Sequence, residues 1–369
     1  MSNSKPIRVA QIMGKLWAGG VENVVFNYYR EIDKSKVQFD FYYDSDSTVV
    51  PPSELINMGA RFIEIPPYQD LPTYISTLRK IFRENDYQIV HSHINTLSVF
   101  PLFAAWIEHV PIRIAHNHSV PGGGEIKRNL LKNFLRMFSR VFSTHYFACS
   151  EKAGRWLFGN RNYDDGNVIV IKNAIDFSKF IRKDSEITEL KSQLGLKDKF
   201  VVGHVGRFTY AKNHEFLIDI FCEICKIRND AVLILVGDGE LHDKIVNKLE
   251  TKKVKNRTLL VGQVTNPEKY YGLFDVVIVP SYFEGLSMTA IESQIAGVPI
   301  VISEAIPNEA IISNGYKYMK LTDSSRKWAT EAVKISNKKV AVNNKAEEYN
   351  IKNKSSFLED WYINNSNNK

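Results

Sequence analysis

A chain of 369 residues is longer than one ordinary domain of about 100 to 200 residues, so we expect two domains. Hydrophobic residues make up 44% and charged residues 24%, which excludes a disordered or fibrous chain, and no run offers the roughly 20 apolar residues that cross a bilayer. The net charge of +7 invites a nucleic-acid partner, but the basic excess lies between Arg113 and Arg155 and favours a more local anionic partner.

Short β-branched runs alternate with helical patterns along most of the chain, which is typical of parallel sheets covered by helices. The first predicted strands are residues 7–13, 37–43, 61–65, 89–92, 113–116, 145–148 and 168–171. Residues 176–198 are polar and charged, with one predicted helix at 187–194, and we interpret them as a linker. The alternation then resumes, with predicted strands at residues 200–205, 231–236, 258–261, 276–280 and 299–303.

This pattern predicts an α/β fold with two doubly wound, Rossmann-like domains, residues 1–175 and 176–345. Ligands of such sheets bind beyond the carboxyl ends of the strands, so a functional motif should follow a strand. The tail at 346–369 is rich in Asn and Lys, and only 356–363 has enough apolar surface to dock. Two alternatives stay open, a closing helix that packs back on the first domain and a frayed end.

Four histidines, His91, His93, His116 and His118, follow or end two neighbouring predicted strands. Histidines so placed could bind a metal ion, but no cysteine or carboxylate accompanies them at ligand spacing. We therefore expect no metal site.

The segment 125–143 repeats apolar residues at helical spacing among Lys127, Arg128, Lys132, Arg136 and Arg140. One interpretation is an ordinary core helix with a basic outer face. The other is an interfacial helix that rests on anionic lipid. Because residues 1–7 lack the apolar core of a signal peptide, we expect a cytoplasmic protein with possible peripheral contact to the inner face of the membrane.

The first candidate binding motif follows the strand predicted at 200–205. Gly206 permits a sharp exit from the strand, and Arg207 and Lys212 place two cations beside the start of a helix. A helix N-terminus already favours anions, so the motif predicts a diphosphate site. The non-functional alternative is that Arg207 and Lys212 are two solvated surface cations.

The second candidate follows the strand predicted at 276–280. Glu284 precedes a helix expected to begin near Leu286, and Glu292 lies about two turns further along nearly the same face. Carboxylates so placed can accept hydrogen bonds from sugar hydroxyls. The backbone amides of Gly285, Leu286 and Ser287 can bind a phosphate. The non-functional alternatives are a helix-capping role for Glu284 and a solvent-facing position for Glu292.

Together these motifs resemble the retaining family-4 glycosyltransferases of the GT-B fold, of the bacterial exopolysaccharide and capsule type. The resemblance covers nearly the whole chain and rests on motifs in the family's order. They are Gly19-Gly20-Val21-Glu22, Gly206-Arg207 with Lys212, Val236-Gly237-Asp238-Gly239, and Glu284 with Glu292 in an E-x7-E arrangement.

The resemblance implies a cleft between two domains, a nucleotide diphosphate sugar donor, most simply a UDP-sugar, and a lipid-linked or oligosaccharide acceptor. Arg207 and Lys212 would neutralise the diphosphate, Glu292 would bind the ribose, and Glu284 the transferred sugar. No metal or other cofactor is implied.

The resemblance also assigns residues of the first domain. Gly19 and Gly20 would let a loop close over the phosphates, and His118 would lie near the anomeric carbon, although His116 is an alternative to His118. Two rival functions keep part of this site: a sugar-nucleotide epimerase of the same fold and a non-catalytic partner of a glycosyltransferase.

Overall fold

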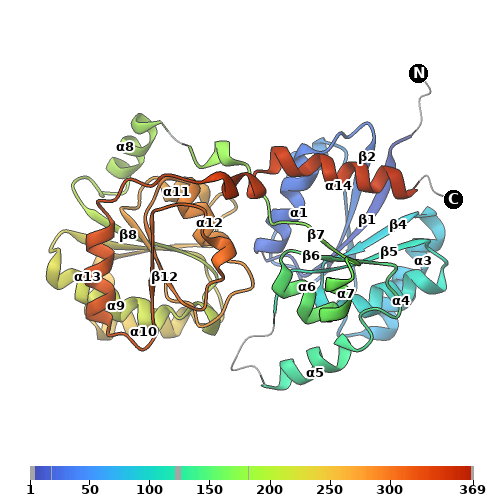
Figure 1. The fold of residues 1–369 in the computed structure, drawn as a ribbon, viewed down its shortest axis with the longest axis horizontal. Helices are drawn as coiled ribbons and strands as arrows, with labels where there is room; N and C mark the ends of the chain where they lie inside the picture. Colours follow the sequence, from blue (N-terminus) through green and yellow to red (C-terminus); the bar gives the residue numbers. More distant parts are fainter. Residues whose placement is uncertain (1–4, 18, 121–125, 182, 367–369) are drawn as a thin grey trace. The chain divides into compact units, whose positions relative to one another are not determined.

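The computed structural model describes residues 5–17, 19–120, 126–181 and 183–366, which form two compact units (Figure 1). The described residues up to Ile175, with those from Glu348 onward, make up the first unit, and those from Asp176 to Glu347 make up the second. Each unit is built on a parallel sheet that carries helices.

The first unit contains a sheet with the strand order β3-β2-β1-β4-β5-β6-β7, all parallel. Its strands are β1 (Ile7–Gly14), β2 (Val37–Asp44), β3 (Arg61–Ile65), β4 (Ile89–Ser92), β5 (Ile112–Asn117), β6 (His145–Ala148) and β7 (Val168–Val170). Its α-helices are α1 (Gly20–Glu31), α2 (Ser53–Asn57), α3 (Leu71–Asn85), α4 (Val99–Ile107), α5 (Ile126–Arg136), α6 (Glu151–Phe158), α7 (Asn160–Asp164) and α14 (Ile351–Ser366). The order reverses between β1 and β4, which is where doubly wound sheets bind ligands.

Both faces of this sheet are buried, because successive residues of a strand point to opposite sides. Val9 of β1 packs in a cluster with side chains of α1 and α14, whereas Ala10 and Ile12 pack with side chains of α3, α4 and α6. The tail therefore ends in a helix that docks on the first unit, through Ile351, Leu358 and Tyr362.

The second unit contains a sheet with the strand order β10-β9-β8-β11-β12-β13, again all parallel. Its strands are β8 (Phe200–Val205), β9 (Ala231–Val236), β10 (Thr258–Gly262), β11 (Val276–Val279), β12 (Ile300–Ser303) and β13 (Tyr316–Met319). Its α-helices are α8 (Asp184–Gln193), α9 (His214–Ile227), α10 (His242–Thr251), α11 (Glu268–Tyr271), α12 (Met288–Ile295) and α13 (Ser325–Ile335). The order reverses between β8 and β11.

Every strand predicted from the sequence is present, with each end within one residue of the prediction. The elements of the second unit that were not predicted individually include β13 and α13. β13 is an edge strand whose first residues, Tyr316 and Lys317, are exposed, so it lacks the apolar run that marks an internal strand. α13 covers the sheet with Trp328 and three further buried residues.

Candidate functional site

The reversal point of the second sheet brings together two of the predicted site residues. Lys212 lies in a short turn after β8, and Glu284 lies in the loop after β11, the strand beside β8. The Lys212 Nζ is 2.6 Å from Glu284 Oε1, and the Ser281 hydroxyl donates to the same oxygen at 2.9 Å. The pair is mostly buried, with exposed side-chain fractions of 19% for Lys212 and 10% for Glu284.

Arg207 takes a different direction. Its Nη2 is 3.2 Å from Glu240 Oε2, and both side chains are about half exposed. This ion pair differs from the sequence prediction, which brought Arg207 and Lys212 together toward the two glutamates. Glu240 comes within reach because the loop before it, residues 237–239, packs on the loop after β8.

The loop at 237–239 requires glycine at two positions. A Cβ on Gly237 would lie 2.2 Å from the carbonyl oxygen of Gly206, and one on Gly239 would lie 2.7 Å from that of Phe208. Gly237 also has a φ of +136°, which L side chains rarely adopt. The backbone N–H of Phe208 donates to the Asp238 carbonyl at 2.9 Å, so the two loops form one backbone surface beside Lys212.

Glu292 is held inside the second unit by a tyrosine. The Tyr271 hydroxyl donates to Glu292 Oε2 at 2.7 Å, and burial raises the pKa of Glu292. A buried carboxyl with one oxygen fixed in this way can accept further hydrogen bonds only in a set direction. The sequence did not reveal Tyr271, because it lies in α11, a helix of four residues with no motif.

The helix after Glu284 begins later than predicted. α12 starts at Met288, and Ser287 caps it with an extended backbone, so Gly285 and Leu286 lie in the loop. Ser287 is buried, and its Oγ has no hydrogen-bond partner among the described residues. A buried hydroxyl without a partner is costly and marks a place where a ligand oxygen can bind.

His204 of β8 also lies at this reversal point, and the sequence analysis did not single it out. Its Nδ1 lies 2.8 Å from the carbonyl oxygen of Ile278, which makes Nδ1 the donor and Nε2 an acceptor. Nε2 faces the loop after β8, since a Cβ on Gly206 would lie 3.2 Å from it. Burial lowers the pKa of His204 to about 4, so the ring is neutral. A histidine inside an apolar strand was the available signal.

In the first unit, Gly19 and Gly20 lie at the start of α1, where β1 leads into the helix. A Cβ on Gly19 would lie 2.8 Å from Glu22 Oε2, and the Glu22 carboxylate accepts a hydrogen bond from the Trp17 N–H at 2.7 Å. A Cβ on Gly20 would meet no described atom within 4 Å, so the backbone here stays open to a ligand.

The four histidines gather at the reversal point of the first sheet. The nearest ring nitrogens are His91 Nε2 and His116 Nδ1, 3.1 Å apart, and His93 Nδ1 and His118 Nε2, 3.0 Å apart. All four rings are buried, and burial lowers the pKa of each; that of His118 falls to about 3. The cluster is therefore uncharged at neutral pH.

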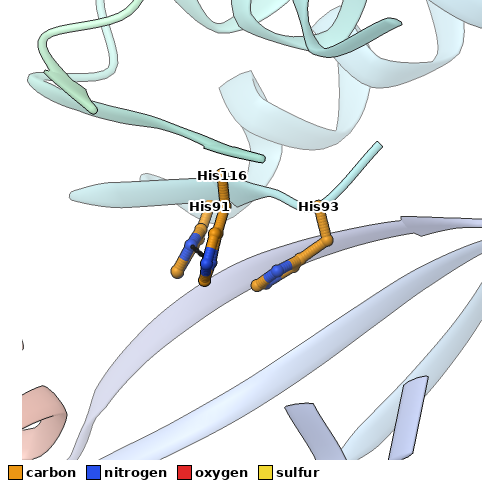
Figure 2. Close-up of side chains that lie close together, drawn as sticks. All are labelled: His91, His93 and His116. Atoms are coloured by element: carbon orange, nitrogen blue, oxygen red, sulfur yellow. Dashed lines mark hydrogen bonds between the residues drawn. The ribbon is translucent and has the colours of Figure 1, made fainter. Parts of the chain in front are cut away.

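One ring nitrogen from each of His91, His93 and His116 lies within 4.8 Å of the others (Figure 2), a spacing that could hold a metal ion. However, His91 and His116 are hydrogen-bonded to each other, and both nitrogens of His93 have partners at 2.8 Å and 3.0 Å. Their rings are also stacked, with a centroid distance of 4.1 Å between His91 and His93. The ring nitrogens of His91 and His93 that a metal ion would need are therefore engaged in hydrogen bonds in this structure.

The basic segment does not form a core helix. Of the predicted segment 125–143, Glu125 is outside the described residues, and the side chains are described from Asn129 onward. Leu135 is buried, but most apolar side chains of α5 and the turn after it have exposed fractions between 39% and 66%. These are Leu130, Leu131, Phe134, Met137, Phe138 and Val141. Lys132, Arg136 and Arg140 lie among them, and we call this set the α5 surface.

Among the described residues, no helix has both the length and the apolar character that a membrane span needs.

Two family models match successive parts of the chain. The model described as Glycosyltransferase Family 4 matches residues 18–179, and the model described as Glycosyl transferases group 1 matches residues 186–354. The first match runs from before α1 to beyond β7 and so leaves out β1, and the second match contains every strand of the second sheet.

Individual proteins match over similar lengths. EpsF of Bacillus subtilis, which is named as a glycosyltransferase, is 31% identical over 334 residues, or 89% of this chain and 87% of EpsF. The Escherichia coli UDP-Gal:alpha-D-GlcNAc-diphosphoundecaprenol alpha-1,3-galactosyltransferase is 27% identical over 67% of this chain and 65% of its own length. The crystal structure of Anabaena HepE in complex with UDP and glucose has a TM-score of 0.75 at 17% identity, covering 96% of this chain and 95% of HepE.

Proposed function

Since the chain belongs to the family-4 glycosyltransferases, retaining enzymes of the GT-B fold, we propose that it moves a hexose or N-acetylhexosamine from a UDP-sugar to a lipid-linked or growing polysaccharide acceptor. The proposed product belongs to a cell-surface polysaccharide. The donor and acceptor classes are supported by the E. coli relative, whose name contains UDP-Gal and a diphosphoundecaprenol acceptor, and by the UDP bound to HepE.

The observation that carries this proposal is the buried Lys212–Glu284 ion pair at the reversal point of the second sheet. A donor that enters here meets a cation for its diphosphate and a carboxylate for its sugar hydroxyls, so each member of the pair exchanges its partner for a ligand group. The unpartnered Ser287 hydroxyl supports a phosphate beside them. Glu292, oriented by Tyr271, is placed to accept from the ribose hydroxyls.

In the proposed reaction the bond between the anomeric carbon and the diphosphate oxygen breaks, and the acceptor oxygen bonds to the same face of the sugar. The acceptor proton leaves with the departing diphosphate, which is the strongest base nearby. Lys212 and, once released from Glu240, Arg207 stabilise the negative charge that develops on this leaving group. Gly19, Gly20, Gly206, Gly285 and Leu286 contribute backbone groups to donor binding, and no metal or cofactor is required.

We also propose that the α5 surface rests on an anionic membrane, where a lipid-linked acceptor is presented. Six exposed apolar side chains flanked by three cations fit the interface between headgroups and acyl chains. Each cation near an anionic surface adds about 1 kcal/mol of attraction. The enzyme would then act at the cytoplasmic face of the membrane without spanning it.

The function is tested by incubating the purified protein with a panel of UDP-sugars, with and without an undecaprenyl-diphosphate-linked sugar. A transferase releases UDP only when the acceptor is present. Conversion of the sugar without acceptor would identify an epimerase instead, and no turnover of any sugar in either condition would identify a non-catalytic subunit. Thermal stabilisation by one member of the panel identifies the donor, because a ligand stabilises the folded state that binds it.

A further inference from the structure

The four buried histidines of the first unit are arranged as two hydrogen-bonded pairs that stack on each other. His91 and His93 lie two residues apart on and just after β4, and His116 and His118 lie likewise on and just after β5, so all four point to one side of the sheet. The ring centroids of His91 and His93 are 4.1 Å apart, and those of His116 and His118 are 4.0 Å apart. Hydrogen bonds join His91 to His116 and His93 to His118.

Gln11 of β1 sets the direction of these hydrogen bonds. Its Oε1 lies 2.8 Å from His93 Nε2, and its Nε2 donates to the Tyr362 hydroxyl at 3.3 Å. An amide oxygen only accepts, so His93 carries its proton on Nε2. The remaining nitrogen of His93, Nδ1, is then an acceptor, and His118 must donate to it from Nε2.

The second pair follows from the same glutamine. The Tyr362 hydroxyl accepts from Gln11, so its own proton goes to His91 Nδ1, 2.6 Å away. His91 then donates from Nε2 to His116 Nδ1. One amide, held by a tyrosine of α14, therefore fixes the tautomers of all four rings, and it does so in a region where burial keeps them neutral.

We propose that Gln11 and His93 are positioning residues that hold His118 with its proton on Nε2, so that Nδ1 is presented as an acceptor to a substrate hydroxyl. This inference rests on the proposed function. His118 Nδ1 is buried and has no hydrogen-bond partner among the described residues, so it can accept a hydrogen bond from a substrate hydroxyl. His116, by contrast, lies within β5 and ends the other pair.

This arrangement assigns different tasks to the two candidate histidines. His118 is the one that contacts substrate, and His116 packs against it as part of the support. A neutral histidine as the partner of His118 fixes its tautomer without the added charge that a carboxylate partner would bring. The acceptor strength of Nδ1 thus depends on hydrogen-bond direction alone.

The test measures the tautomer of His118 in the full-length protein by nitrogen NMR with labelled histidine, together with kcat/KM. We expect His118 to be protonated at Nε2 and bare at Nδ1. His93→Phe keeps the stacked ring but removes the acceptor, so His118 should no longer hold its proton on Nε2 alone, and kcat/KM should fall roughly tenfold to a hundredfold. In His93→Asn the Oδ1 can accept in place of Nδ1, so most of the Nε2 tautomer and most of kcat/KM should return. His145→Gln, outside the cluster, should change neither the tautomer of His118 nor kcat/KM.

Three outcomes would overturn the proposal: a proton on His118 Nδ1 in the unaltered protein, an unchanged tautomer in His93→Phe, or stoichiometric retention of added Zn²⁺ that is lost in His93→Phe. Zn²⁺ retention of this kind would mean that the partner of His93 Nδ1 is a metal ion and not the N–H of His118. Full activity in His118→Ala would overturn the role of this relay in catalysis while leaving UDP-sugar turnover, and so the proposed function, intact.

Discussion

The two units place polar groups at the same point of their topology but use opposite chemistry. In the second unit, where the strand order reverses between β8 and β11, a lysine and a glutamate meet at 2.6 Å. In the first unit, where it reverses between β1 and β4, the polar groups are four neutral imidazoles, a glutamine and a tyrosine. An ion pair orders the side chains in the second unit, and hydrogen bonds between neutral groups order them in the first.

The difference matches what the proposed function requires each unit to bind. In that proposal the second unit binds a charged diphosphate and so needs a cation, and burying that cation is tolerable because Glu284 pairs with it. Hydroxyl groups carry none, so the first unit can use neutral acceptors that need no counter-ion. Protonating the cluster would bury uncompensated charge, and the lowered pKa of each ring expresses that cost.

The largest expected effect is on the charged side. Lys212→Ala should lower kcat roughly a hundredfold to a thousandfold, because it removes a preorganised contact to the leaving diphosphate. Steady-state kinetics with saturating donor measures this, and Lys244→Ala, an exposed lysine of the same unit paired with Glu215, is the matched control. Equal, small losses in both variants would contradict the assigned role of Lys212.

A second difference between the units is the α5 surface, which belongs to the first. Reversing two of its charges, Lys132→Glu with Arg140→Glu, should weaken binding to anionic-lipid vesicles by at least about 2 kcal/mol, or about thirtyfold, because the attraction of both cations is lost. Vesicle co-sedimentation measures the affinity, and Lys338→Glu with Lys339→Glu makes the same change in net charge on exposed residues of the second unit. Vesicle binding that survives the first pair of changes and high salt would refute the electrostatic part of the membrane proposal.

Glu292 tests whether charge in the second unit serves binding as well as catalysis. Glu292→Gln keeps an oxygen for the Tyr271 hydroxyl but removes the charge, so hydrogen bonds to the ribose weaken. We expect a roughly tenfold rise in the donor KM with kcat changed less than about twofold. A large fall in kcat with an unaltered KM would assign Glu292 to the chemical step.

The smallest expected effect is on the neutral side, where the prediction is no change. Since the pKa of His118 is lowered to about 3, His118 stays neutral throughout the range in which an ordinary histidine titrates, and it would gain a proton only on strong acidification. The pH profile of kcat/KM between about pH 5.5 and 8 should therefore contain no inflection that belongs to this residue. An inflection in the unaltered enzyme that is missing in His118→Asn would contradict the neutral cluster.

The sequence was sufficient to predict the strands because each is a short β-branched run between turn signals, and buried parallel strands need little else. It also located Lys212 and Glu284, since both follow neighbouring strands. It could not predict that Arg207 pairs with Glu240, because this depends on how tightly a glycine loop packs on the loop after β8. Such packing is a property of the backbone and is not visible in residue spacing.

The histidine cluster shows a similar limit. The spacing of two HxH motifs after neighbouring strands predicted that the rings would be near each other, but not what fixes their protons. Gln11 lies 82 residues before His93, and Tyr362 lies 271 residues after His91. Tyr362 reaches His91 only because the tail forms α14 and packs on the first unit. The polar composition of the tail did not decide between this docked helix and a frayed end.

The configuration of the product formed from a UDP-sugar and a lipid-linked acceptor tests the role of the charged site most directly. Proton NMR of the new glycoside should show the anomeric configuration of the donor, formed by the unaltered enzyme and nearly absent with Lys212→Ala. An inverted linkage, or a retained linkage formed equally well without the lysine, would contradict a site in which Lys212 draws the diphosphate away from the face that the acceptor then attacks.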